Sequence, residues 1–284
     1  MIFRFNLLFL LLWLFLSCDY IDPVNAFFSS SPDSRFEDGK NRPDPLPPEY
    51  IDAADFKFLV ISDTHYYKKQ PRYFGRMKAF IKEREVNFIV HLGDITQSGR
   101  KKQFELFSED FSSLHIPLYP LIGNHDLYND GYNHFLDFFG KTNYFLSIGE
   151  ATLIFLDTAN ASLGNLQKIW FEQILEANKD RMVFVFAHIG PDGGGVQKPT
   201  EMPYPEDVYY FYHINERWGT DIFSAGHLHM YIDNTVRGCR YITLNNLEED
   251  SRSAFLVKVS GNSYSTEILS GTMSPESFDS ELEE

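Results

Sequence analysis

Five β-prone runs in this chain are each followed, at once or after a single serine or glycine, by histidine, aspartate or asparagine. The runs occupy 56–61, 88–92, 118–122, 183–187 and 221–225. They alternate with stretches whose apolar residues recur at helical spacing, such as Phe74, Met77 and Ile81. Strands that alternate with helices predict an α/β fold in which helices cover the sheets. The region from 240 to 269 reads as strand after strand, which predicts antiparallel pairing there.

The residues that follow these runs are all hard or borderline metal ligands. They are Asp63 and His65, then Asp94, then Asn124, His125 and Asp126, then His188, and finally His227 and His229. Ligand sites gather at the carboxyl ends of α/β strands because loops converge there on a rigid sheet. In an extended chain, the two-residue spacing of Asp63 and His65 would place both side chains on one face. The same holds for His227 and His229. Since no thiolate is among them, a cysteine-type zinc site is not expected.

Each cluster has a simpler interpretation when it stands alone. A single histidine at a strand end is usually structural, and a glycine followed by aspartate usually forms a turn. Five clusters in one consistent context instead indicate a shared metal site. The histidines outside the clusters, which we interpret as structural, are His91, His115, His134 and His213. Cys239 is expected to be a buried strand residue.

Taken in order, these clusters resemble the motifs of the calcineurin-like metallophosphoesterase family, D-x-H, G-D, G-N-H-[D/E], H and G-H-x-H. The resemblance covers roughly residues 55 to 270. It implies a four-layer αββα sandwich with two mixed β-sheets and a dinuclear metal site at the strand ends. It also implies two divalent or trivalent ions, such as manganese, iron or zinc. Gln97 stands where purple acid phosphatases place a metal-binding tyrosine, which disfavours that class.

The resemblance further implies a role for each residue. The first metal would be held by Asp63, His65, Asp94 and His229. The second would be held by Asp94, Asn124, His188 and His227, with Asp94 bridging. His125 would be an acid that does not bind metal, and Asp126 would orient it. The implied reaction is hydrolysis of a small phosphomonoester or phosphodiester by hydroxide from a water that the metals acidify.

The net charge limits the partners we expect, and two questions about function stay open. The formal net charge of −15 argues against a nucleic acid as the main partner, because such proteins usually carry a basic face. A membrane-tethered lipoprotein that holds metals without turnover is the alternative, although pure binding would need neither His125 nor Asp126. The 191–218 segment is either an aromatic cap over the substrate or a loop that leads into a core-packed helix.

The chain ends suggest export. Residues 1–17 have the pattern of a signal peptide, and Phe15-Leu16-Ser17-Cys18 resembles a bacterial lipobox. We therefore expect a lipid on Cys18 and a membrane-anchored protein of the cell envelope or periplasm. Residues 18–50 are predicted to form a Pro/Ser-rich tether. The metallophosphoesterase domain would span 51–271, and 272–284 would be an acidic flexible tail. No oligomeric state is predicted.

Overall fold

The computed structural model describes residues 30–69, 71–191, 202–247 and 251–270. Its elements, in chain order, are α3 (Pro32–Gly39), β1 (Asp55–Ile61), α4 (Arg72–Arg84), β2 (Phe88–His91), α5 (Lys101–Ser112), β3 (Leu118–Pro120), the 3₁₀ helix η1 (His125–Leu127), α6 (Gly131–Phe139), β4 (Tyr144–Ile148), β5 (Ala151–Leu156), α7 (Asn165–Ala177), β6 (Met182–Ala187), α8 (Pro205–Trp218), β7 (Ile222–Ala225), β8 (Ile232–Val236), β9 (Cys239–Thr243), β10 (Ser251–Ser260) and β11 (Ser263–Ser270). The predicted signal peptide, Cys18 and the acidic tail lie outside the described residues.

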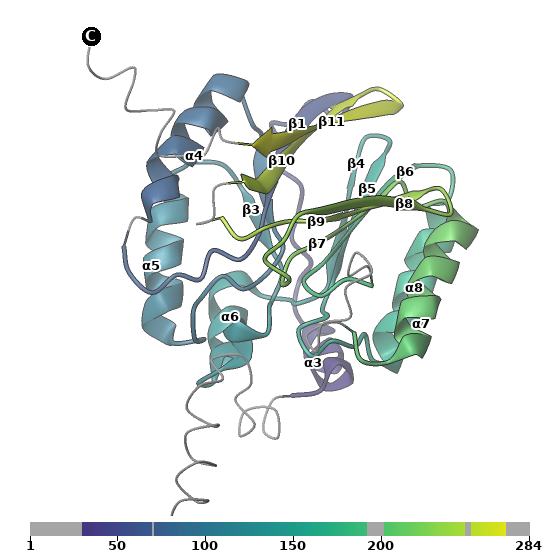
Figure 1. The fold of residues 1–284 in the computed structure, drawn as a ribbon, viewed down its shortest axis with the longest axis horizontal. Coiled ribbons are helices and arrows are strands. Elements are labelled where there is room, and N and C mark those ends of the chain that lie inside the picture. Colours follow the sequence, from purple (N-terminus) through teal and green to yellow (C-terminus); the bar gives the residue numbers. More distant parts are fainter. Residues whose placement is uncertain (1–29, 70, 192–201, 248–250, 271–284) are drawn as a thin grey trace, which may run out of the picture. The chain divides into compact units, whose positions relative to one another are not determined.

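The strands form two mixed sheets (Figure 1). The first sheet has the order β11-β10-β1-β2-β3, in which β1, β2 and β3 are parallel and β10 is antiparallel to both neighbours. The second sheet has the order β4-β5-β6-β7-β9-β8, with β5, β6, β7 and β9 parallel. The expected antiparallel ending holds for the pairs β8–β9 and β10–β11. It does not hold for β9, which runs parallel to β7.

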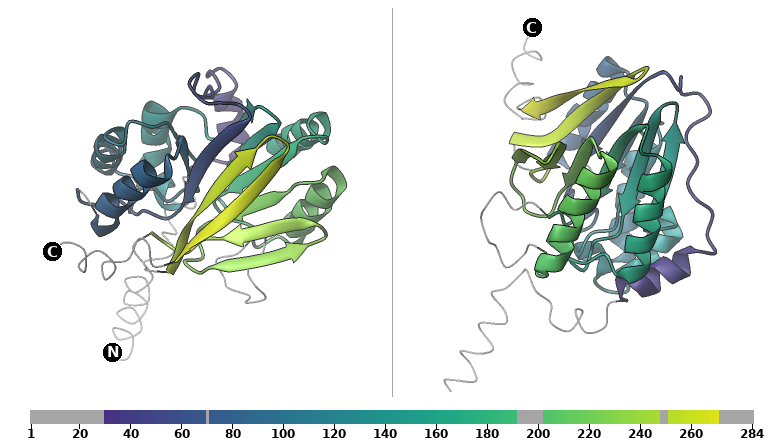
Figure 2. Two further views of the ribbon diagram at one scale, coloured as in Figure 1. Left: turned by 90° about the horizontal axis from the view of Figure 1, so that it is seen from above. Right: turned by 90° about the vertical axis from the view of Figure 1, so that its right-hand side faces the viewer.

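The side chains of β1 alternate between two cores, as a strand buried on both faces requires. Phe56, Phe58 and Val60 pack in the core between the two sheets. Leu59 and Ile61 pack in the core that includes residues of α4 and α5. A third core joins the second sheet to α7 and α8, so helices cover the outer face of each sheet (Figure 2). The predicted αββα fold with two mixed sheets is confirmed.

The face that α7 buries matches its apolar pattern only in part. The pattern predicts a stripe of Leu166, Ile169, Trp170 and Ile174, of which Trp170 and Ile174 pack partly buried against the third core, whereas Ile169 is 58% exposed. The buried positions are Gln167, Phe171 and Leu175. Gln167 can be buried because its amide donates to the carbonyls of Asp157 and Leu163 and accepts from the Asp157 N–H. A pattern of apolar residues cannot predict that a polar residue such as Gln167 is buried.

The helix α8 answers part of the open question on the 191–218 segment. It packs on the second sheet beside α7 with Phe211 and Ile214 in the core, whereas Tyr209 is exposed. For residues 205–218 the structure therefore agrees with a core-packed helix. The glycine stretch at 193–195 lies outside the described residues.

The segment ahead of β1 departs from the predicted tether. Residues 32–39 form the helix α3, which lies against α7, and Arg35 is fully buried. Further along, Tyr119 donates a hydrogen bond to the Leu46 carbonyl. Paired polar groups attach this proline-rich segment to the domain, which composition alone does not predict. No helix among the described residues has the length and apolar character that crossing a membrane requires.

Phe58 offers a test of the core between the sheets. Its ring stacks on Phe88 at 5.1 Å and meets Phe184 edge-on at 5.7 Å, so it joins the two sheets. Phe58→Ala should lower the free energy of unfolding by about 3–5 kcal/mol, because it removes a large ring and leaves a cavity. Ile169→Ala, at an exposed position, should change it by less than about 0.5 kcal/mol. Urea unfolding monitored by circular dichroism measures both, and equal effects would contradict this packing.

Candidate metal centre

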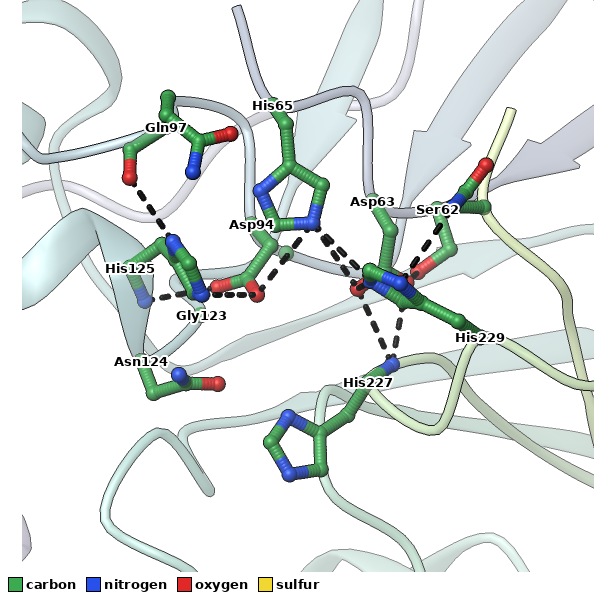
Figure 3. Close-up of polar contacts among 12 residues, drawn as sticks. Ser62, Asp63, His65, Asp94, Gln97, Gly123, Asn124, His125, His227 and His229 are labelled. Atoms are coloured by element: carbon green, nitrogen blue, oxygen red, sulfur yellow. Dashed lines mark hydrogen bonds and ion pairs between the residues drawn. The ribbon is translucent and has the colours of Figure 1, made fainter. Parts of the chain in front are cut away.

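The predicted site residues lie together, on loops that leave β1, β2, β3, β6 and β7 at their carboxyl ends (Figure 3). In each sheet these strands are parallel, so their carboxyl ends share one edge. Hydrogen bonds tie the loops of the two sheets to each other. The N–H of His227 donates to the Asp63 carboxylate, and His188 Nδ1 donates to the Leu92 carbonyl.

One group of ligands consists of Asp63, His65 and His229, whose ligand atoms lie within 4.8 Å of one another. Asp63 Oδ1 is 3.3 Å from His229 Nε2 and 3.8 Å from His65 Nε2. The two Nε2 atoms are 3.0 Å apart. The buried Asp63 carboxylate also accepts a hydrogen bond from the Ser62 hydroxyl. These residues are three of the four predicted for the first metal.

A second group consists of Asp94, His188 and His227. His188 Nε2 lies 3.3 Å from Asp94 Oδ1 and 2.9 Å from Asn124 Oδ1. The rings of His188 and His227 have their centroids 5.2 Å apart. Asn124 therefore joins this group, which then contains all four residues predicted for the second metal.

Asp94 lies between the two groups. Its Oδ1 faces His188, and its Oδ2 is 3.9 Å from His65 Nε2. The N–H of His125 donates to Oδ1 at 2.8 Å, which fixes the orientation of the carboxylate. The two oxygens of one carboxylate thus face different ligand groups. This is the arrangement that a bridging residue needs.

The backbone that carries these ligands is strained. Five of the seven predicted ligands have a positive φ: Asp63 at 51°, His65 at 42°, Asp94 at 53°, His227 at 68° and His229 at 49°. Such conformations are uncommon outside glycine and gather at functional sites. These pairs are therefore not in the extended conformation that we expected. Asp63 and His65 nevertheless share one group, whereas His227 and His229 belong to different groups.

Three glycines permit the loops to approach one another closely. A Cβ on Gly93 would lie 2.8 Å from His188 Nδ1. A Cβ on Gly123 would overlap the N and Oδ1 atoms of Asp94, and one on Gly226 would overlap Ser62 Oγ and Asp63 Oδ2. Of these three, Gly93 alone has a positive φ. Gly123 and Gly226 are thus needed for space against the ligands and not for a special turn.

Asp126 is placed differently from the role that the resemblance implied, whereas the role of His125 stays a prediction. His125 Nδ1 donates to the backbone carbonyl of Gln97 at 2.8 Å, and its Nε2 lies 4.0 Å from Asp94 Oδ2. The Asp126 carboxylate instead accepts from the N–H groups of Ile95, Thr96 and Gly123 and from the Thr96 hydroxyl. The prediction that Asp126 orients His125 was wrong: Gln97 orients it. Asp126 joins the loops after β2 and β3.

Two residues that contact the ligands are not among the predicted site residues. The Thr158 hydroxyl accepts from the N–H groups of His188 and Ile189 at 3.0 and 2.8 Å. The Asn246 amide lies 3.3 Å from His229 Nδ1. Thr158 follows β5 and Asn246 follows β9, so applying the strand-end rule to those two strands would have found them.

The electrostatics of the cluster favour positive charge. Burial opposes ionisation of Asp94, but the neighbouring His188 and His125 outweigh it and hold its pKa well below the usual value. Burial also lowers the pKa of His188, but the carboxylates of Asp94 and Asp63 outweigh it and raise that pKa to about 9. Two buried carboxylates thus require a counter-charge, which a proton or a metal cation can supply.

The donor set fits metal ions. Each group combines a carboxylate with two imidazoles, and Asn124 adds an amide oxygen. Such nitrogen and oxygen donors suit manganese, iron and zinc. His188 donates a hydrogen bond from Nδ1 to the Leu92 carbonyl, as metal-binding histidines commonly do. Its Nε2 is then available to the ion.

A fold of this kind with such a site defines a class of metal-dependent hydrolases. The family model for calcineurin-like phosphoesterases matches residues 56–231. This chain belongs to that family.

The chain is similar to proteins with named activities. A probable glycerophosphodiester phosphodiesterase (GpdQ) of Arcobacter nitrofigilis is 28% identical over 162 residues, which are 49% of this chain and 59% of the relative's own length. A probable cyclic nucleotide phosphodiesterase of Rhodopseudomonas palustris is 24% identical over 205 residues, which are 64% of this chain and 74% of the relative. A dimetal phosphatase from Danio rerio shares the fold with a TM-score of 0.60 at 14% identity, and the match covers 76% of this chain and 99% of that one.

Gly226 tests the close packing of the loops. Gly226→Ala should push the Asp63 carboxylate out of place and weaken manganese binding by roughly 10–100-fold, the usual effect of disturbing a ligand's support. Gly75→Ala is the matched control, because a Cβ at Gly75 meets nothing within 4 Å. It should leave metal binding unchanged. Titration calorimetry with Mn²⁺ measures both, and unchanged affinity in Gly226→Ala would contradict the packing.

Proposed function

We propose that this protein hydrolyses phosphate esters at a dinuclear metal centre. The observation that carries the proposal is Asp94, whose two carboxylate oxygens face two separate groups of ligands. Asp63, His65 and His229 would hold one ion, and Asn124, His188 and His227 the other, with Asp94 shared. Membership of the calcineurin-like phosphoesterase family supports the reaction class.

When bound, two metal ions neutralise the charge of a phosphate ester and lower the pKa of a water, which provides hydroxide near neutral pH. His125 supplies the proton chemistry. Its Nδ1–H is held by the Gln97 carbonyl, so Nε2 faces the cluster and can stabilise or protonate the leaving oxygen. The buried Asp126 keeps the His125 loop beside Asp94 by accepting hydrogen bonds from both loops.

The substrate we infer is a phosphodiester. Both curated relatives described above are named as phosphodiesterases, one for glycerophosphodiesters and one for cyclic nucleotides. A small phosphodiester also agrees with the acidic chain, because the charge that attracts the phosphate would come from the metals and not from a basic surface.

Asn124 and His125 separate metal binding from proton transfer. His125→Ala should reduce the hydrolysis of bis(4-nitrophenyl) phosphate by about 10²–10⁴-fold, the usual range for a positioned acid. Asn124→Ala should nearly abolish it, because a metal ligand is lost. Metal content, measured by mass spectrometry, should fall only in Asn124→Ala. His213→Ala is the control, because His213 is exposed on α8.

Two outcomes would overturn this proposal. Hydrolysis by His125→Ala at the normal rate would remove the role given to that side chain. Two metals bound to the unaltered protein with hydrolysis of neither this diester nor 4-nitrophenyl phosphate would contradict the phosphoesterase activity itself.

A further inference from the structure

Arg35 is a fully buried cation in a helix that precedes the family match at residue 56. Its Nε and Nη2 atoms each donate at 2.7 Å to a different oxygen of Asp157. In α3 only Arg35 and Gly39 are buried, and the half-buried Phe36 meets Trp170 of α7 edge-on at 6.1 Å. Burying an arginine and an aspartate is costly unless their geometry is nearly ideal. The bidentate geometry meets that condition and fixes Asp157 in orientation.

Asp157 precedes Thr158, whose hydroxyl bonds to the backbone of the predicted ligand His188. It follows β5, which pairs with β6 in parallel register up to Leu156 and Ala187. One step further along, Asp157 is level with His188. The hydroxyl of the next residue, Thr158, accepts from the N–H groups of His188 and Ile189. A chain of short contacts thus leads from the Arg35 guanidinium to the backbone of His188.

α3 also holds the far end of the same loop. Asp33 Oδ1 accepts from the N–H of Leu166 at 2.9 Å, in the first turn of α7. Arg35 and Asp33 thus attach α3 to both ends of residues 157–166. The loop 157–166, which contacts His188, is therefore held at both ends by α3, a helix outside the family match.

We propose that Arg35 is a positioning residue for the second ligand group, acting through Asp157 and Thr158 on His188. This inference rests on the proposed function, since it assigns those ligands to a metal. The Arg35 guanidinium bonds to Asp157, which is one residue away from Thr158. Its effect is to restrict where the His188 backbone can lie.

Hydrogen exchange of the metal-free, full-length protein tests the positioning directly. In Arg35→Met the amides of His188 and Ile189 should exchange roughly tenfold faster, because their acceptor Thr158 is no longer held. The amides of Asp63 and His65, which bond within the first sheet's loops, should be unchanged. Arg42→Met is the control, since Arg42 is an exposed arginine that donates to the Leu136 carbonyl.

Metal titration supplies the second readout. Wild type should show two Co²⁺ binding steps in its absorption spectrum, which His188→Ala and His229→Ala assign to the two groups. Arg35→Met should weaken the step that His188→Ala removes by about tenfold, as expected of an outer-shell change, and leave the other unchanged. Thr158→Val should have the same selectivity without altering α3.

The outcomes separate this inference from the proposed function. Unchanged exchange at His188 and Ile189 in Arg35→Met would overturn the positioning role, whatever metals bind. Faster exchange at all amides, with both binding steps weakened equally, would mean that Arg35 only stabilises the fold. That result would also overturn the positioning role. Fewer than two Co²⁺ steps in wild type would contradict the dinuclear centre, while the exchange measurement would still decide on Arg35.

Discussion

A single buried carboxylate, that of Asp94, joins the two halves of this structure. Its first oxygen accepts from the His125 N–H and faces His188 of the second sheet, and its second oxygen faces His65 of the first sheet. Burial of a charged group this close to Asp63 is unfavourable without nearby positive charge. The surrounding imidazoles and the proposed metals meet that need. The folding of the two sheets onto one core is what brings these groups together.

The loops that bear the ligands show how the fold accepts local strain for this purpose. Asp63, His65 and Asp94 all adopt a left-handed backbone conformation. These loops begin at the ends of parallel strands. Asp126 and Thr158 fix the loops by accepting hydrogen bonds from backbone N–H groups. Strain of this kind persists where the surrounding structure determines the conformation. Specificity for the ester would then depend on residues outside this rigid shell.

Much of the fold and the ligand set could be predicted from the sequence, because strand ends and their polar residues are local signals. Asp63, Asp94 and His188 follow apolar runs whose parallel pairing dictates a common edge. The role of Asp126 could not be predicted, since it depends on which backbone groups of another loop come near. Arg35 was missed for a related reason. A proline-rich segment looks like a tether until its buried partner, Asp157, is known from the three-dimensional arrangement.

We propose that two ions share Asp94. Anomalous scattering from crystals of the protein grown with Mn²⁺ would locate the ions without reference to activity. We expect two peaks flanking the Asp94 carboxylate, one beside Asp63 and His229 and the other beside Asn124 and His188. A single peak, or two peaks that do not share Asp94, would contradict it.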